Sequence, residues 1–179
     1  MDLRSLIHEV PDFPRPGISF KDATPLMANA KAFAELVERL AAALHEEPAD
    51  GPAVTHVVAP EARGFIFGAA LARELGAGFV PTRKWGRLPR PTRATDYELE
   101  YGIDQLHAHL DAFGPGDRVV VCDDLIATGG TAAAVAELVV ESQAELGAFA
   151  FAIELTALGG RQALARFGAP ILSVITFER

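Results

Sequence analysis

Cysteine is nearly absent from the 179-residue sequence, which contains only Cys122. A single cysteine excludes a disulfide framework within the chain and any zinc site built from several cysteines. Because disulfides are common in oxidising compartments, we expect this chain to work in a reducing compartment, the cytoplasm. Cys122 ends an apolar segment, and we interpret it as a small core residue.

Long hydrophobic runs are also missing. No apolar run reaches the roughly 18 residues that a membrane helix needs, so we expect no contact with a membrane. Residues 1–10 carry charges every few positions, and we expect no secretory signal there. Hydrophobic residues make up 50% of the chain, which excludes a disordered protein, and the length fits a single domain over residues 1–179.

Basic residues are in the minority, with 16 Lys and Arg against 24 Asp and Glu and a formal net charge of −8. This balance argues against broad nucleic-acid binding, which requires a basic face. It leaves room for one small anion, because five of the basic residues are clustered. These are Arg83, Lys84, Arg87, Arg90 and Arg93. A solvated basic loop is the alternative interpretation of this cluster.

Short apolar segments alternate with helical patterns along the chain. Apolar residues at spacings of three and four predict a helix over residues 30–46, and further helices are predicted over 65–75, ended by Gly76, and over 131–146. Strands are predicted over 55–59, 78–82, 118–122, 148–155 and 171–176. Because these strands are apolar on both faces, the pattern predicts an α/β fold with a mostly parallel central sheet flanked by helices.

Three segments are less regular. Residues 1–28 contain several prolines that exclude a long helix. Residues 84–102 form a long excursion, either a flap or a hairpin. Residues 106–113 fit a short helix or a strand, and the pattern does not decide between them.

The stretch after the predicted strand 118–122 carries the clearest chemistry. Two acids, Asp123 and Asp124, precede a loop of small residues that opens a helix, with the order Ala127, Thr128, Gly129, Gly130 and Thr131. Backbone N–H groups at a helix start, with glycine allowing close approach, form a cradle for an anion. The acids suit neutral ribose hydroxyls or a hydrated Mg²⁺. A helix N-cap after a solvated acidic turn is the alternative.

This arrangement resembles the ribose-phosphate motif of the type I phosphoribosyltransferases, and the whole chain is similar to the adenine phosphoribosyltransferase family. Six segments carry the likeness in the family's order: PDFPRPGISFKDATP (11–25), EARGF (61–65), FVPTRK (79–84), LEYG (99–102), the loop 123–131 and ELT (154–156). The resemblance implies the type I phosphoribosyltransferase fold with a flexible hood. It also implies conversion of adenine and 5-phosphoribosyl 1-pyrophosphate (PRPP) to AMP and pyrophosphate.

The resemblance assigns roles at both ends of the sugar. Ala127, Thr128, Gly129, Gly130 and Thr131 correspond to the 5′-phosphate loop, and Asp123 and Asp124 to the ribose-binding acids. The pyrophosphate-binding positions correspond to Arg63, Arg83, Lys84 and Arg87. Arg87 stands where the family usually has lysine. A surface ion pair between Glu61 and Arg63 is the alternative interpretation of that turn.

The resemblance also assigns the adenine site. Phe20 and Leu155 correspond to residues on the two faces of the base, and Ser19 and Lys21 to residues that contribute mostly backbone groups. Residues 1–28 are then the base-binding segment and residues 84–102 the hood. Glu100 corresponds to the catalytic hood acid, although Glu98 shares its face if the segment is a strand. Core packing is the alternative for Phe20.

The resemblance further implies Mg²⁺ as cofactor and a homodimer in which Arg87 reaches toward the neighbouring site. Mg²⁺ is expected to be held through PRPP, with Asp123 and Asp124 as the possible protein ligands. Two other functions stay open. One is a phosphoribosyltransferase for another purine. The other is a non-catalytic regulator that senses the sugar ligand, although such proteins usually carry a DNA-binding domain or a basic face.

Overall fold

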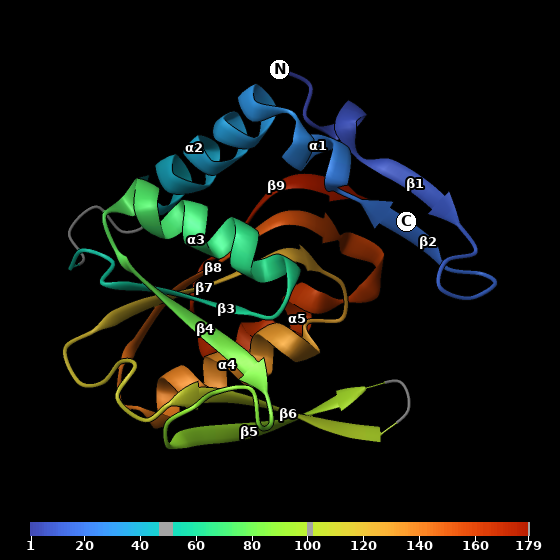
Figure 1. The fold of residues 1–179 in the computed structure, drawn as a ribbon. Helices are drawn as coiled ribbons and strands as arrows, with labels where there is room; N and C mark the ends of the chain where they lie inside the picture. The colour runs from blue at the N-terminus through green and yellow to red at the C-terminus, as the bar shows by residue number, and fades with distance from the viewer. Residues whose placement is uncertain (47–51, 100–101, 179) are drawn as a thin grey trace.

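The computed structural model describes residues 1–46, 52–99 and 102–178. Most of its central sheet consists of five parallel strands: β3 (His56–Pro60), β4 (Gly78–Lys84), β7 (Arg118–Ile126), β8 (Glu145–Leu155) and β9 (Ile171–Phe177). The antiparallel strands β5 (Thr92–Leu99) and β6 (Gly102–His109) extend the sheet beside β4. The full order is β5-β6-β4-β3-β7-β8-β9 (Figure 1).

Helices cover both faces of this sheet (Figure 1). On one face lie α2 (Ala30–Glu46) and α3 (Arg63–Leu75), whose buried leucines and Phe67 belong to one apolar cluster. On the other face lie α4 (Gly130–Glu141) and α5 (Gly160–Leu164), which contribute to a second cluster. The predicted α/β fold with a mostly parallel sheet flanked by helices is confirmed.

Neighbouring strand residues are divided between the two apolar clusters. Val57 and Cys122 pack with α2 and α3, whereas Val58 and Val121 pack on the side of α4, and all four are fully buried. This alternation explains why the strands are apolar at every position. Burial raises the pKa of the Cys122 thiol, and its interpretation as a core residue is confirmed.

The first two helices match the sequence pattern closely. The predicted helix over 30–46 is α2. The helix predicted over 65–75 is α3. It begins at Arg63, two residues before the predicted start, and is ended as predicted by Gly76, which has a φ of +66°. Glycine reaches this left-handed conformation without steric cost, which is why it ends the helix.

The predicted ends of the strand before the 127–131 loop and of the helix after it are both wrong. Strand β7 runs to Ile126 instead of residue 122, because Leu125 and Ile126 continue the ladder opposite Ile153 and Glu154 of β8. Asp123 and Asp124 therefore belong to a strand, and not to the predicted loop.

Helix α4 ends at Glu141 instead of residue 146. Gln143 has a φ of +63°, which no α-helix allows, and β8 begins at Glu145. Helix-favouring residues near this point are drawn into the sheet, since Leu146 pairs with Val119.

The proline-rich first 28 residues contain more structure than the sequence predicts. A short 3₁₀ turn, η1 (Arg4–Leu6), precedes the hairpin of β1 (His8–Pro11) and β2 (Ser19–Asp22), and α1 (Thr24–Ala28) follows. No helix here exceeds five residues, as the prolines predict. The hairpin projects beside the carboxyl end of β9 (Figure 1).

The excursion over residues 84–102 contains strand β5 and the start of β6, which favours the predicted hairpin over a flap. Residues 106–109 are in β6, so the strand alternative holds for that part of 106–113. Three short elements after β8 were not predicted: η2 (Thr156–Leu158), α5 and η3 (Ala165–Phe167). Within the described residues, no helix has the length and apolar character to cross a membrane.

Candidate active site

The 127–131 loop connects the carboxyl end of β7 to α4 and lines a cavity of about 220 Å³. Gly129 precedes the helix with a φ of +85°, a conformation that favours glycine. Arg63, Asp123 and Asp124 complete part of the cavity wall. Because the first N–H groups of a helix have no partners inside the helix, this wall suits an anion.

A second cavity of about 250 Å³ adjoins the first. Four residues line both cavities: Arg63, Asp123, Asp124 and Thr131. The second cavity is completed by the turn after β3, by Lys84 at the end of β4 and by Leu106 of β6. Asp123 and Asp124 therefore lie between the two cavities. The first cavity contains the start of α4, and the second is lined by the cationic side chains of Arg63 and Lys84.

Arg63 is placed between the acid pair and the N-terminal hairpin. Its Nε donates to Asp124 Oδ2 at 2.5 Å, and its guanidinium lies 5.6 Å from the centre of the Phe20 ring. Burial alone would lower the pKa of Arg63, but the hydrogen bond and charge of Asp124, with Asp123 and Asp22, raise it. The guanidinium therefore stays charged where it faces both cavities.

Glu61 pairs with Arg83 rather than with Arg63. Its Oε2 accepts hydrogen bonds from Arg83 Nη2 at 3.1 Å and Nε at 3.3 Å, and its Oε1 accepts one from the Lys84 N–H at 2.6 Å. Burial favours a higher pKa for Glu61, but these hydrogen bonds outweigh it and lower the pKa. The alternative of a Glu61–Arg63 ion pair does not match this geometry. The peptide bond between Glu61 and Ala62 is cis.

Asp124 of the acid pair is buried, and Asp123 is half-buried. Asp124 is 8% exposed, and its N–H donates to Asp123 Oδ1 at 2.8 Å. Burial, followed by the neighbouring charge of Asp124, raises the pKa of Asp123 well above its usual value. Gly64 leaves room for this carboxylate, because a Cβ there would lie 2.7 Å from Asp123 Oδ1. The glycine of the 61–65 segment is thus explained by the acid it faces.

The predicted basic residues do not all line the cavities. Arg63 and Lys84 do, whereas the side chains of Arg83 and Arg87 are not part of either wall. Arg83 donates to Glu61 and to the carbonyl oxygen of Arg87 at 3.3 Å. Lys84 Nζ lies 2.8 Å from Asp104 Oδ2, on β6, the strand that pairs with β4.

The predicted adenine-site residues lie beside the cavities rather than in their walls. Phe20 contacts Phe13 edge-on at 5.2 Å, and Ser19 is exposed. The Lys21 side chain is buried, with Nζ 2.8 Å from Glu9 Oε2 and 4.8 Å from the Phe177 ring centre. Leu155 is half-buried at the end of β8. Lys21 therefore anchors the hairpin to β9 through its side chain.

The hood acid predicted at Glu100 lies outside the described residues. Two other features of the site were not found from the sequence. Leu106 forms part of the second cavity, and Asp104 pairs with Lys84. Neither carries a local signal, because both depend on how β6 pairs with β4. In the N-terminal hairpin, the carboxylates of Asp12 and Asp22 accept hydrogen bonds from the N–H groups of Gly17 and Thr24 and shape local turns.

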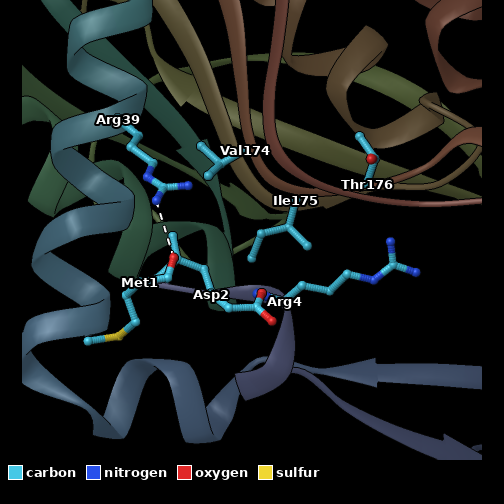
Figure 2. Close-up of a pocket in the computed structure, with 8 residues that line it drawn as sticks. Met1, Asp2, Arg4, Arg39, Val174, Ile175 and Thr176 are labelled. Atoms are coloured by element: carbon cyan, nitrogen blue, oxygen red, sulfur yellow. Dashed lines mark hydrogen bonds between the residues drawn. The ribbon is translucent and has the colours of Figure 1, made fainter.

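Another cavity, of about 220 Å³, lies away from the acid pair, between the N-terminal residues, α2 and β9 (Figure 2). Arg39 reaches into it and donates to the Met1 carbonyl oxygen at 3.2 Å (Figure 2). The same guanidinium pairs with Glu35 at 2.5 Å, and Glu35 also accepts from the Met1 ammonium at 2.9 Å. This region therefore fixes the start of the chain to α2.

Comparison with known proteins bears on the two adjoining cavities. Residues 27–157 match the model of the phosphoribosyl transferase domain family. The adenine phosphoribosyltransferase of Synechococcus sp. (strain JA-3-3Ab) is 56% identical over 164 residues, which are 92% of this chain and 91% of the relative. The chain belongs to the adenine phosphoribosyltransferase family.

Solved structures of the adenine phosphoribosyltransferase family have the same fold. The enzyme of Thermoanaerobacter pseudethanolicus matches with a TM-score of 0.90 at 49% identity, covering 98% of both chains. The Saccharomyces cerevisiae enzyme, complexed with D-2,5-dideoxy-2,5-imino-altritol 1,6-bisphosphate and adenine, matches with a TM-score of 0.90 at 40% identity, covering 96% of both. The type I phosphoribosyltransferase fold is thereby confirmed. The matched span 27–157 contains the residues that line both cavities and leaves the β1–β2 hairpin outside it.

Proposed function

We propose that the chain is an adenine phosphoribosyltransferase, which joins adenine to PRPP and releases AMP and pyrophosphate. The observation that carries this proposal is the pair of adjoining cavities with Arg63, Asp123, Asp124 and Thr131 in their shared wall. PRPP has an anionic group at each end and a diol between them, and this arrangement suits it. The high identity to adenine phosphoribosyltransferases favours adenine over the other purines.

The first cavity is proposed to hold the 5′-phosphate. Its wall contains the 127–131 loop, where backbone N–H groups and the hydroxyls of Thr128 and Thr131 are available as donors. The absence of bulky side chains lets the phosphate approach the backbone. Asp123 and Asp124 are proposed to accept hydrogen bonds from the ribose hydroxyls at the boundary of the cavities.

The second cavity is proposed to hold the pyrophosphate. Arg63 and Lys84 line it, and an arginine fork is well suited to two phosphate oxygens. Arg63 is paired with Asp124 in this structure, so we propose that the pyrophosphate takes over this guanidinium and leaves Asp124 for the ribose. Arg83 and Arg87 are proposed to contact the pyrophosphate once the hood, residues 84–102, closes.

Adenine is proposed to stack between Phe20 and Leu155, with backbone groups of Ser19 and Lys21 at its edge. The position of the hairpin beside the acid pair supports this, since the Phe20 ring lies 5.6 Å from Arg63. Glu100 is proposed to accept the proton that the base nitrogen loses as the C–N bond forms. Closure of the hood then excludes water from the activated sugar.

The residues of the shared wall also fit Mg²⁺. Among the described residues, no group of three or more His, Cys, Asp or Glu side chains is placed to hold a metal ion. Mg²⁺ is commonly bound by one or two carboxylates together with substrate phosphates, and Asp123 and Asp124 supply such carboxylates. When bound, Mg²⁺ neutralises charge on the departing pyrophosphate. The role of the chain is then to align C1′ with the base.

A homodimer is proposed as well, with Arg87 of one subunit reaching toward the site of the other. Trp85 supports this, because the side chain beside Arg87 is 76% exposed although it is large and apolar. The cytoplasm is the proposed location, because one buried cysteine fits a reducing compartment.

The proposed function is tested by product formation. The protein is incubated with PRPP, Mg²⁺ and one base at a time from adenine, hypoxanthine, guanine and xanthine, and nucleotides are separated by chromatography. We expect AMP from adenine and little product from the other bases. IMP, GMP or XMP as the main product would mean that the substrate is another purine and not adenine. PRPP binding without any nucleotide would favour the ligand-sensing regulator.

A further inference from the structure

The turn that begins α5 lies directly against the 127–131 loop. A Cβ on Gly160 would be 2.5 Å from the Ala127 carbonyl oxygen and 2.6 Å from Ile126 Cγ1. A Cβ on Gly129 would be 3.0 Å from the Gly160 carbonyl oxygen. The two backbones are therefore in contact, and there is no room for a side chain at residue 160. The position of α5 sets the position of the loop.

Helix α5 has five residues, too few to be stable without outside contacts. Arg161, its second residue, supplies such contacts. Its Nε and Nη2 donate to the two carboxylate oxygens of Glu154, both at 2.8 Å, and its Nη1 donates to the Ile171 carbonyl oxygen at 2.8 Å. Ser173 joins the same group, since it accepts from Arg161 at 3.3 Å and donates to Glu154 at 2.5 Å. One guanidinium thus joins α5 to β8 and β9.

Glu154 connects the Arg161 ion pair to the strand that leads into the 127–131 loop. It is 4% exposed and pairs in register with Ile126, the last residue of β7 before the loop. Burial alone would raise the pKa of Glu154, but the hydrogen bonds from Arg161 and Ser173 lower it, so the carboxylate stays ionised. A two-pronged ion pair fixes orientation as well as distance.

We propose that Arg161, held by Glu154 and Ser173, is a positioning residue for the 5′-phosphate site. It keeps Gly160 against the backbone of residues 126–129 and thereby holds the loop in the shape that receives the phosphate. This inference rests on the proposed function of the 127–131 loop. It concerns only one end of PRPP, because Gly160 contacts the loop, and the hydrogen bonds that Arg161 makes among the described residues go to Glu154, Ile171 and Ser173, which line neither cavity.

The test measures the two ends of the substrate separately. Ribose 5-phosphate probes the loop and Mg-pyrophosphate probes the other cavity, each titrated by calorimetry into wild type and Arg161→Ala. We expect the dissociation constant for ribose 5-phosphate to rise by about tenfold to a hundredfold, the size expected when one hydrogen bond to a charged phosphate is lost, while that for pyrophosphate stays unchanged. The KM for PRPP is expected to rise with the first constant.

Two milder variants keep the test decisive if Arg161→Ala fails to fold. Arg161→Lys keeps the charge but not the planar fork, and Ser173→Ala removes one partner of the group. Both are expected to weaken ribose 5-phosphate binding less than Arg161→Ala and to leave pyrophosphate binding unchanged. Arg166→Ala is the matched control, because it breaks the Arg166–Glu137 ion pair without touching the loop and should bind both ligands like wild type.

Equal weakening of both ligands would overturn the proposal, because it would mean a general loss of structure. Unchanged ribose 5-phosphate affinity in Arg161→Ala would also overturn it. These readouts do not depend on turnover. If the wild type binds ribose 5-phosphate and Arg161→Ala does not, the positioning role stands even where no AMP is formed, and only the proposed reaction fails.

Discussion

Arg63 has competing partners within the candidate site. It pairs with Asp124, lies against Phe20 and lines both cavities. A bound pyrophosphate offers more negative charge than one carboxylate, so binding exchanges one partner for another. Arg73 is an exposed arginine near the other end of the same helix, outside the walls of both cavities. It is therefore a matched control for Arg63.

We predict that Arg63→Ala weakens the binding of Mg-PRPP by at least about tenfold, since hydrogen bonds to charged groups contribute roughly 1.5–3 kcal/mol. Calorimetric titration measures this, with Arg73→Ala expected to bind like wild type. Wild-type affinity in Arg63→Ala would remove Arg63 from the pyrophosphate site.

Asp123 links the site to folding stability through its raised pKa. An acid with a raised pKa in the fold contributes stability below its unfolded pKa, and this contribution is lost as the pH rises through the folded value. At neutral pH the native fold is therefore less stable than it would be with a side chain at residue 123 that does not titrate. Burial next to Asp124 is the cause, and such a cost is typical of a functional site.

We predict that Asp123→Asn melts about 2–4 °C above wild type at pH 7, and that this difference shrinks toward pH 4. Scanning calorimetry across this pH range measures it.

The double change Asp123→Asn with Asp124→Asn is expected to remove most turnover and to leave the fold intact. A lower melting temperature for Asp123→Asn at pH 7, or unchanged rates in the double variant, would contradict the account of the acid pair.

At the scale of elements, the β1–β2 hairpin is fixed by its buried lysine. The Lys21 ammonium bonds Glu9 and lies over the ring of Phe177 at the end of β9. Phe20, which we propose to stack on the base, directly precedes Lys21 in the chain. A change in the contacts of Lys21 is therefore expected to displace Phe20 as well. The phosphoribosyl transferase domain model matches residues 27–157 and does not include this hairpin.

We predict that Lys21→Ala raises the KM for adenine several-fold and changes the KM for PRPP much less, because the substrate contacts proposed for the hairpin are contacts with the base. Steady-state kinetics with each substrate varied in turn measure the two constants. Lys31→Ala, an exposed lysine of α2, is the control. Equal changes in both KM values would argue against a base-binding role for the hairpin.

Local patterns predicted the elements that carry strong periodicity. The stripe of α2 and the apolar runs of β3, β4, β8 and β9 are examples. The ends of β7 and α4 were missed because they are decided by pairing across the sheet, as Leu125 opposite Ile153 illustrates. The β1–β2 hairpin was missed because its prolines conceal short extended segments between them.

The candidate site divides in the same way. The 127–131 loop and the acid pair are adjacent in sequence, so one motif located them. Arg63 pairs with Asp124 and Arg83 with Glu61, 61 and 22 residues away in the chain, so no local pattern could have chosen these partners. No local pattern pointed to Arg161, because its proposed positioning role depends on Glu154, Ile171 and Ser173 meeting in space.

At the scale of the whole molecule, the seven-stranded sheet brings the carboxyl ends of β3, β4 and β7 to one edge, where both cavities lie. Ligands of parallel α/β sheets are bound at this edge. Trp85 and Arg87 lie in the turn that follows β4, so a second subunit covering Trp85 would bring Arg87 close to a neighbouring site.

We predict a homodimer with twice the 19.0 kDa mass of the chain in size-exclusion chromatography with light scattering. Trp85→Lys is expected to shift the protein toward monomer, whereas Val140→Lys, at another exposed apolar residue, is expected to leave the mass unchanged. A monomer over the whole micromolar range would contradict the dimer.

The central claim is that the two adjoining cavities together bind PRPP along its whole length. A crystal structure of the protein with PRPP and Mg²⁺ tests it most directly. The account predicts the 5′-phosphate in the 127–131 loop, the ribose hydroxyls at Asp123 and Asp124, and the pyrophosphate at Arg63 and Lys84. PRPP bound elsewhere, or with Arg63 still paired to Asp124 and the loop empty, would contradict it.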